Sequence, residues 1–146
     1  MLTIISCGKR KSNDPAPAKD LYTGGLFHAS RRYAEAQGRP WVILSALHGL
    51  LHPDSVISPY DLAMHERLSQ PPAVVARFKA DLRQQLQAVL AAFGLVGIEV
   101  HGGADYAALL LAVSPVPLWN PVGGMTVGLR LQWYARERRQ REGAGQ

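Results

Sequence analysis

Side chains that can do chemistry come directly after a short apolar run near the amino terminus. The run is followed by a serine, the chain's single cysteine, a glycine and three basic residues, in the order Ser6, Cys7, Gly8, Lys9, Arg10 and Lys11. Oriented backbone N–H groups beside lysine ammonium groups form a site for an anion. We therefore predict that Ser6, Gly8, Lys9 and Lys11 bind a substrate. The spacing differs from that of a P-loop, which argues against nucleoside triphosphate hydrolysis.

Cys7 is a candidate nucleophile if the basic loop favours its thiolate, and His28 or His48 would then act as its base. The alternative is an inert cysteine at the end of a buried strand. His48 and His52 have the spacing of zinc ligands on a helix. Glycine and proline residues place both histidines in a loop, however, and no third ligand is near them. We therefore predict no metal and no cofactor.

Carboxylates, tyrosines and glycines of the same loops supply further candidates. Asp54 and Asp61 can act as general acid or base, Asp20 can accept a hydrogen bond from a sugar hydroxyl, and Tyr22 and Tyr60 can stack on a base. The remaining predicted substrate-binding residues are Ser45, Gly49, Gly102 and Gly103. All of these also have structural interpretations, because aspartate and glycine form turns and tyrosine packs at half-buried positions.

Short apolar runs predict the strands that position these loops. Strands are expected at residues 2–6, 41–45 and 97–101, with a weaker one at 116–119. Helices are expected at residues 25–36, within 60–68, after the Pro71-Pro72 pair, at 104–112 and at the carboxyl end. Residues 9–20 and 47–59 contain proline and glycine and are expected to be loops.

The alternation of strands and helices predicts an α/β fold, specifically a three-layer, Rossmann-like domain with a short, mostly parallel sheet of about four strands. The chain has 146 residues, of which 47% are hydrophobic and 18% charged, as expected of one globular domain over residues 1–146. Ligands of such sheets bind at the carboxyl ends of the strands, where the candidate residues lie. The single cysteine and the lack of a long apolar run or a signal sequence predict a cytoplasmic protein that does not span a membrane.

Positive charge is concentrated in the last helix and tail. The chain has a formal net charge of +5 and an isoelectric point near 9.7. Five arginines are candidates for contacts with the phosphates of a nucleic acid: Arg130, Arg136, Arg138, Arg139 and Arg141. A basic terminal helix is equally typical of a helix end that is simply kept solvated.

The sequence resembles an uncharacterised family of small bacterial and phage proteins. The resemblance rests on three segments, Ser6-Cys7-Gly8-Lys9-Arg10-Lys11, Asp20-Leu21-Tyr22-Thr23-Gly24-Gly25-Leu26-Phe27 and Leu44-Ser45-Ala46-Leu47-His48-Gly49-Leu50-Leu51, and continues through Pro53-Asp54, Ile57 and Pro59-Tyr60-Asp61. With a weaker segment from Gly124 to Trp133, it covers most of the chain. The family implies no settled activity.

A more remote similarity links the chain to the peroxide-stress YaaA family and to the core domain of archaeosine synthase, which works on a 7-deazaguanine base in transfer RNA. The matching features are Cys7 with Lys9 or Lys11, then His28 or Ser30, then Ser45 with Gly49-Leu50. This chain departs from those proteins in its longer, proline-broken loop before Tyr22, and we expect no accessory RNA-binding domain within its 146 residues.

These observations leave two main functions open. The first is an enzyme that acts on a nucleoside or on a base in nucleic acid, by glycosidic-bond cleavage or base modification, with His48, Asp54 or Asp61 moving protons. The second is a non-catalytic nucleic-acid-binding module of a stress or phage-related system that uses the terminal arginines. A thiol enzyme centred on Cys7 is a third, less favoured alternative. The predicted partner is a nucleobase, nucleotide or nucleic acid in the first two cases.

Overall fold

Three parallel strands form the centre of the sheet. In the computed structural model, which describes residues 1–144, β1 (Leu2–Ser6) lies between β3 (Trp41–Ser45) and β6 (Ile98–His101). Apolar side chains on both faces of these strands are buried, which explains why each reads as a short continuous apolar run. Because the strands are parallel, Ser6, Ser45 and His101 end at the same edge of the sheet.

Two short strands complete this sheet in the order β4-β3-β1-β6-β7. At one side β7 (Leu118–Trp119) runs parallel to β6, and at the other β4 (Gly49–Leu51) runs antiparallel to β3. The prediction of a three-layer α/β fold with a mostly parallel sheet is confirmed. The expectation that residues 47–59 form only a loop is wrong, because the chain reverses after Ser45 and pairs back on β3.

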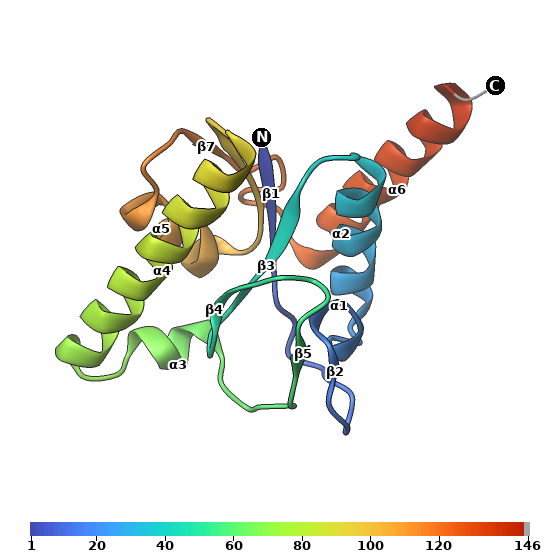
Figure 1. Cartoon of the computed structure of the whole chain (residues 1–146). Helices are drawn as coiled ribbons and strands as arrows, with labels where there is room; N and C mark the ends of the chain where they lie inside the picture. Colours follow the sequence, from blue (N-terminus) through green and yellow to red (C-terminus); the bar gives the residue numbers. More distant parts are fainter. Residues whose placement is uncertain (145–146) are drawn as a thin grey trace.

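Helices cover both faces of the sheet (Figure 1). On one face lie α2 (Gly25–Ala36) and α6 (Val127–Ala144), which pack against each other. On the other lie α4 (Pro72–Phe93), α5 (Ala104–Val113) and the short α3 (Met64–Leu68). The long helix α4 buries a row of residues four apart, Phe78, Leu82, Leu86 and Leu90, and ends at Gly94, whose φ is +62°.

A small second sheet supports the long loops. β2 (Ala16–Pro17) pairs antiparallel with β5 (Val56–Ile57), and α1 (Ala18–Leu21) follows β2 directly. Residues 9–20 are therefore not a simple loop, contrary to the sequence prediction. Pairing with a strand about 40 residues later orders this proline-containing segment, and local sequence does not reveal such a partner.

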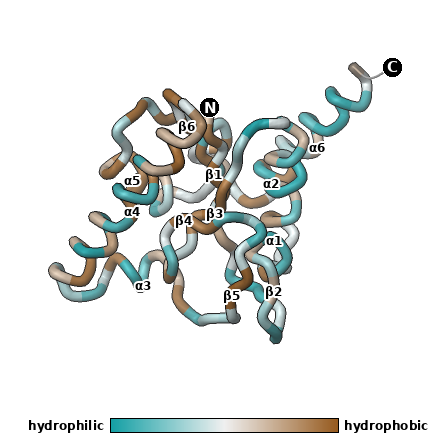
Figure 2. Tube along the Cα trace, viewed as in Figure 1, coloured by the Kyte–Doolittle hydropathy of each residue, from teal (hydrophilic) through white to brown (hydrophobic). Residues whose placement is uncertain are grey.

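The core is divided by the sheet into two main clusters. The cluster on the α4 and α5 face includes Leu2, Ile4 and Leu82, and the cluster on the α2 face includes Ile5, Tyr22 and Phe27. Figure 2 shows hydrophobic residues along the central strands and hydrophilic ones along α6. The rigid centre therefore fixes the strand ends from which the candidate loops start.

Gly49 has a backbone role that accounts for glycine at this position. Its φ is +73°, and a Cβ atom there would overlap the side-chain amide oxygen of Gln85. That oxygen accepts a hydrogen bond of 2.9 Å from the Leu50 N–H, while the Gln85 amide nitrogen donates to the His48 carbonyl at 3.2 Å. Gln85 therefore caps β4 from α4, and Gly49 makes the close approach possible.

Replacing Gly49 with alanine should lower the free energy of unfolding by about 2 kcal/mol. Alanine is strained in the left-handed backbone conformation of this position, and its Cβ atom would displace Gln85. Gly38→Ala is the matched control, because Gly38 also has a positive φ, +68°, but has open space where a Cβ would go. It should cost only the strain, about 1 kcal/mol. Urea unfolding of both variants measures the difference, and equal losses would contradict the capping role of Gln85.

Candidate functional site

A chain of hydroxyl groups joins the ends of two loops at the carboxyl edge of the sheet. The Tyr60 hydroxyl lies 2.7 Å from Ser45 Oγ at the end of β3 and 2.7 Å from the Tyr22 hydroxyl. Tyr22 is fully buried, and burial raises its pKa to about 12. Burial and the neighbouring Cys7 also raise the pKa of Tyr60. Both phenols are therefore protonated near neutral pH. Each hydroxyl can donate one hydrogen bond and accept another.

Lys11 and His48 lie against the ring of Tyr60. The Lys11 ammonium is 4.4 Å from the Tyr60 ring centre, and an isolated antiparallel bridge between Lys11 and Tyr22 ties this part of the loop to the cluster. The His48 ring meets the Tyr60 ring edge-on with centres 5.7 Å apart. The half-buried Tyr60 thus has a cation over its ring and an imidazole beside it.

The loop that carries His48 is held by Ser45 and Arg67. Ser45 Oγ accepts hydrogen bonds of 3.2 Å from the N–H groups of Leu47 and His48. The Arg67 guanidinium donates to the carbonyls of Ala46 and Leu47 at 2.7 and 2.9 Å. Burial, and then the charge of Arg67, lower the pKa of His48. A neutral imidazole at neutral pH can accept a proton.

Cys7 connects this cluster to the helix that follows β6. Its Sγ lies 3.3 Å from the hydroxyl of Tyr106, on the first turns of α5. Burial and the neighbouring thiol raise the pKa of Tyr106, so the phenol stays protonated and can donate to sulfur. Tyr106 is not among the site residues predicted from the sequence. The signal available for it is its place shortly after the Gly102-Gly103 pair, which follows β6.

A small crevice lies where the loops after β1 and β6 separate. Its volume is about 60 Å³, and its lining includes Ser6, Cys7, Gly8, Gly102 and Arg130. This is the position at which open α/β sheets bind ligands, because one connection leaves β1 toward β3 and the other leaves β6 toward β7. A Cβ on Gly102 would lie 3.3 Å from that of Ser6, so glycine allows the two loops to meet.

Other predicted residues are paired with side chains outside the cluster or are exposed to solvent. Asp54 pairs with Lys19 at 2.7 Å, and this hydrogen bond lowers the pKa of the carboxyl. Asp20 pairs with Arg31 at 2.8 Å. His28, Lys9 and Asp61 are exposed, as is the side of α6 that carries Arg136, Arg138 and Arg139. Gly103 is the residue before the first turn of α5.

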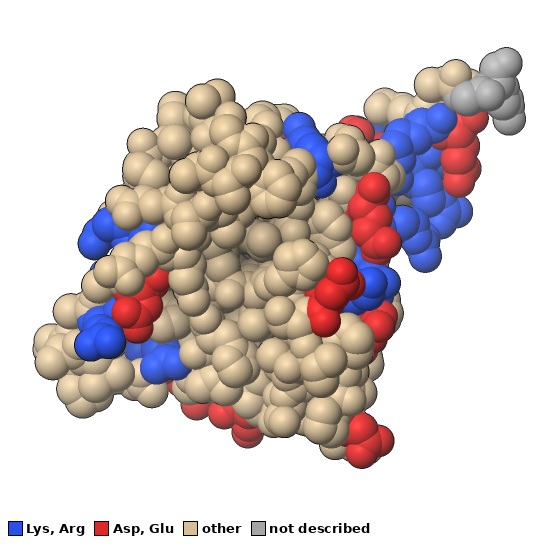
Figure 3. Space-filling view, viewed as in Figure 1, with Lys and Arg blue, Asp and Glu red and all other residues tan. Residues whose placement is uncertain are grey.

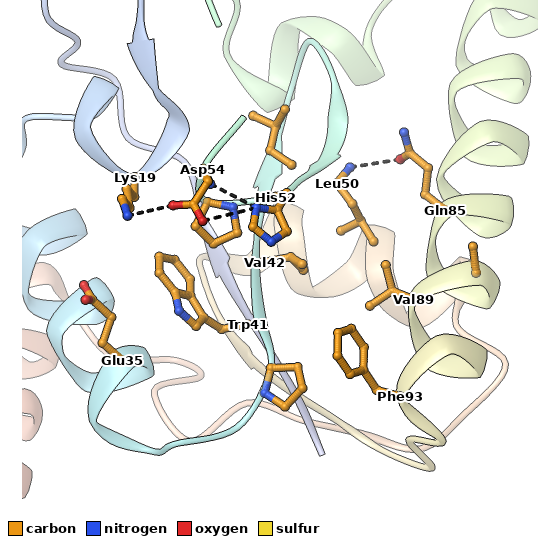
Figure 4. Close-up of a pocket in the computed structure, with 14 residues that line it drawn as sticks. Lys19, Glu35, Trp41, Val42, Leu50, His52, Asp54, Gln85, Val89 and Phe93 are labelled. Atoms are coloured by element: carbon orange, nitrogen blue, oxygen red, sulfur yellow. Dashed lines mark hydrogen bonds and ion pairs between the residues drawn. The ribbon is translucent and has the colours of Figure 1, made fainter. Parts of the chain in front are cut away.

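Asp54 instead borders a cavity of about 600 Å³ that lies at the side of the sheet (Figure 4). Apolar side chains such as Trp41, Leu50, Val89 and Phe93 make most of its wall, with the Lys19–Asp54 pair and His52 at its margin. No cysteine, serine, threonine or tyrosine lines it among residues 1–144. We therefore place the candidate active site at the carboxyl edge, where a thiol, phenols and an imidazole come together.

A buried polar network lies beneath the α2–α6 face. The Glu99 carboxylate accepts hydrogen bonds from Arg39 at 2.6 Å, from the Tyr33 hydroxyl at 3.1 Å and from His101 Nε2 at 3.2 Å. His101 Nδ1 lies 2.8 Å from the Tyr134 hydroxyl. The burial of Glu99 acts to raise its pKa, but His101, Arg39 and Tyr33 outweigh burial, and the pKa is lowered. The carboxylate is thus ionised in the interior.

Comparison with known proteins agrees with the sequence resemblance. The sequence model of a family of unknown function, DUF6884, matches residues 2–136. The chain belongs to this family. The matched range includes the whole cluster of Cys7, Tyr22, Ser45, Tyr60 and Tyr106.

Two curated relatives match parts of this DUF6884 chain. An uncharacterized protein, YfjM of Bacillus subtilis (strain 168), is 44% identical over 63 residues, which are 39% of this chain and 42% of that protein. A UPF0246 protein of Salinispora tropica is 46% identical over 59 residues, 38% of this chain and 21% of that protein. The latter agrees with the similarity to the YaaA family. The chain thus spans less than half of either relative, and no solved structure matches it significantly.

Within residues 1–144, no helix is both long enough and apolar enough to cross a membrane. The same residues contain no group of three or more histidine, cysteine or carboxylate side chains arranged to hold a metal ion.

Proposed function

We propose that this DUF6884 protein is an enzyme that acts on a nucleoside or on a base in nucleic acid, at the carboxyl edge of its sheet. One observation carries the proposal: the Cys7 thiol lies among tyrosine hydroxyls, one of which, Tyr60, has the Lys11 ammonium over its ring. A nucleophile, proton carriers and a cation are thereby brought to the edge at which α/β sheets bind ligands.

The cluster has groups suited to a nucleobase that carries a sugar or phosphate. A base needs an aromatic face and hydrogen bonds to its edge, and the half-buried Tyr60 and the exposed His48 supply these types, while the buried Ser45 holds the Tyr60 hydroxyl. Lys11 supplies a positive charge for a phosphate. Tyr22 cannot stack on a base in this conformation, because it is fully buried, so the stacking role predicted for it is replaced by support of Tyr60.

The same geometry narrows the choice of groups that move protons. His48, with its lowered pKa, is available as a base, whereas Asp54 is held by Lys19 away from the cluster. In this proposal Cys7 acts as a nucleophile or proton donor, which the Tyr106 hydroxyl 3.3 Å from its sulfur supports. The proposed chemistry is glycosidic-bond cleavage or base modification in which Cys7 and His48 are the catalytic residues.

The proposal predicts that a nucleobase, nucleoside, nucleotide or 7-deazaguanine raises the melting temperature of the protein. Binding to the native state stabilises it by mass action, by about 2.7 kcal/mol when the ligand is at a hundred times its Kd. His48→Ala should reduce the rise, because it removes the imidazole beside Tyr60. The measurement is thermal unfolding against a panel of these ligands and of short DNA and RNA.

His65→Ala is the matched control, since His65 is an exposed histidine on α3 outside the cluster. It should keep the full ligand-induced rise. If no small ligand of the panel raises the melting temperature, or if the two histidine variants lose the rise equally, the base-processing site is not at this edge.

A further inference from the structure

The two helices on one face of the sheet leave a basic groove between them. The groove has a volume of about 310 Å³, and α2 contributes Arg32 and Tyr33 to it while α6 contributes Tyr134, Arg138, Arg139 and Arg141. Figure 3 shows basic side chains gathered along α6. The groove is separate from the carboxyl-edge cluster, because none of Cys7, Ser45, Tyr60 or Tyr106 lines it.

The charge of the groove is largely uncompensated within residues 1–144. Arg138 pairs with Glu142 at 3.3 Å. The structure gives Arg32, Arg139 and Arg141 no carboxylate within 4 Å in that part of the chain. Like charges held close together repel one another, and an anion between them removes this repulsion.

Arg141 gives a second and independent indication of a ligand. Its guanidinium lies over the Tyr33 ring, 5.9 Å from the ring centre, and is half-buried. Its Nη1 atom is buried and is the one such side-chain nitrogen or oxygen of the described residues without a hydrogen-bond partner. Buried donors in folded proteins are almost always paired, and a charged donor left unpaired is especially costly. Among residues 1–144, Arg141 therefore lacks an acceptor for one of its charged donors at the wall of the groove.

We propose that the groove between α2 and α6 binds a phosphate group of a ligand. Guanidinium groups bind phosphate oxygens through paired, charge-assisted hydrogen bonds, and two helices present four of them here. The floor is fixed, because the hydroxyls of Tyr33 and Tyr134 bond to the buried Glu99 and His101. Arg130 and Arg136 do not line the groove, so the terminal arginines do not act as one set. This inference is independent of the proposed enzyme activity.

The test is calorimetric titration with inorganic phosphate and pyrophosphate at low ionic strength. The double variant Arg139→Gln/Arg141→Gln should bind both anions at least about tenfold more weakly. Charged hydrogen bonds supply a large part of the free energy with which so small an anion binds, and the variant removes such bonds. The control is Arg83→Gln/Arg136→Gln, which removes the same charge from exposed sites on α4 and α6. It should change the affinity less than about twofold, because neither side chain lines the groove and so neither contacts an anion bound there.

Equal weakening in both double variants would overturn the proposal, because it would show that phosphate responds to the diffuse positive charge of the surface. The absence of phosphate binding by the wild-type chain would also overturn it. Thermal unfolding of each variant checks that Arg141 is not merely a packing residue of Tyr33. A nucleoside monophosphate and a short single-stranded oligonucleotide then distinguish the source of the phosphate. Affinity that falls steeply with salt for the oligonucleotide alone identifies a nucleic-acid backbone, and similar, shallow salt dependence for both identifies a compact phosphorylated ligand.

Discussion

Glu99→Gln should lower the free energy of unfolding by about 3 kcal/mol at pH 7, because it leaves Arg39 and His101 facing a neutral amide in the protein interior. The Glu99 side chain is 3% exposed and that of His101 is fully buried, so water cannot replace the lost charge around them. The Arg39 side chain is 28% exposed, which keeps the loss near the lower end of the range for a broken buried pair. Urea unfolding measures the change.

Glu35→Gln is the control for this substitution. Glu35 pairs with Arg31 on the surface of α2, with a side chain that is 48% exposed, and its removal should cost less than about 1 kcal/mol. If Glu99→Gln and Glu35→Gln have equal effects, the interior network does not stabilise the fold through the charge of Glu99.

The contribution of Glu99 should also depend on pH in a defined direction. Its pKa in the folded protein is below the value of 4.5 that applies to an unperturbed glutamate. The unfolded chain therefore binds a proton at a higher pH than the folded chain does, and the stabilisation is complete above pH 4.5 and is lost as the pH falls through the folded pKa. The difference in unfolding free energy between wild type and Glu99→Gln should be constant from pH 7 to about 5 and shrink below 4.5.

This network also shows why part of the structure could not be read from the sequence. Periodicity locates β1, β3, β6, α2 and α4, because each has an apolar pattern set by burial. Glu99 interrupts such a pattern within β6, and its partners Arg39 and Tyr33 are about 60 residues away along the chain. A charged residue in a strand gives no sign of the partners that make its burial possible.

The candidate site could likewise be predicted from the sequence only in part. The loops after β1 and β3 could be selected because parallel strands bring their carboxyl ends together, and Cys7, Lys11, Ser45, His48 and Tyr60 lie there. The sequence alone does not show that Tyr22 is fully buried or that Lys19 holds Asp54 away from the cluster. Both features depend on the pairing of β2 with β5, which are distant along the chain. Tyr106 joins the cluster only because α5 follows the neighbouring strand β6.

The strongest test of the cluster is the removal of one oxygen atom from its centre. Tyr60→Phe retains the ring beneath Lys11 and beside His48 but removes the hydroxyl that lies between Ser45 and Tyr22. The buried Tyr22 hydroxyl then loses its partner, so the free energy of unfolding should fall by about 1–3 kcal/mol. Under the proposed function, affinity for the nucleobase ligand should fall about tenfold or more as well, because a hydrogen-bonded site that loses one group leaves other polar groups unpaired.

These two losses can be separated by comparing Tyr60→Phe with a substitution at one end of the hydroxyl chain, Tyr22→Phe. Tyr22→Phe breaks the Tyr22–Tyr60 bond but leaves Ser45 and Tyr60 paired at 2.7 Å. If the cluster binds a ligand through Tyr60, Tyr22→Phe should lose a similar amount of stability and much less affinity than Tyr60→Phe, as measured by urea unfolding and calorimetric titration. A stability loss without any change in ligand affinity in both variants would make the hydroxyl chain a structural device that positions the loop after β3, and the active site would then have to lie in the crevice around Cys7 and Arg130.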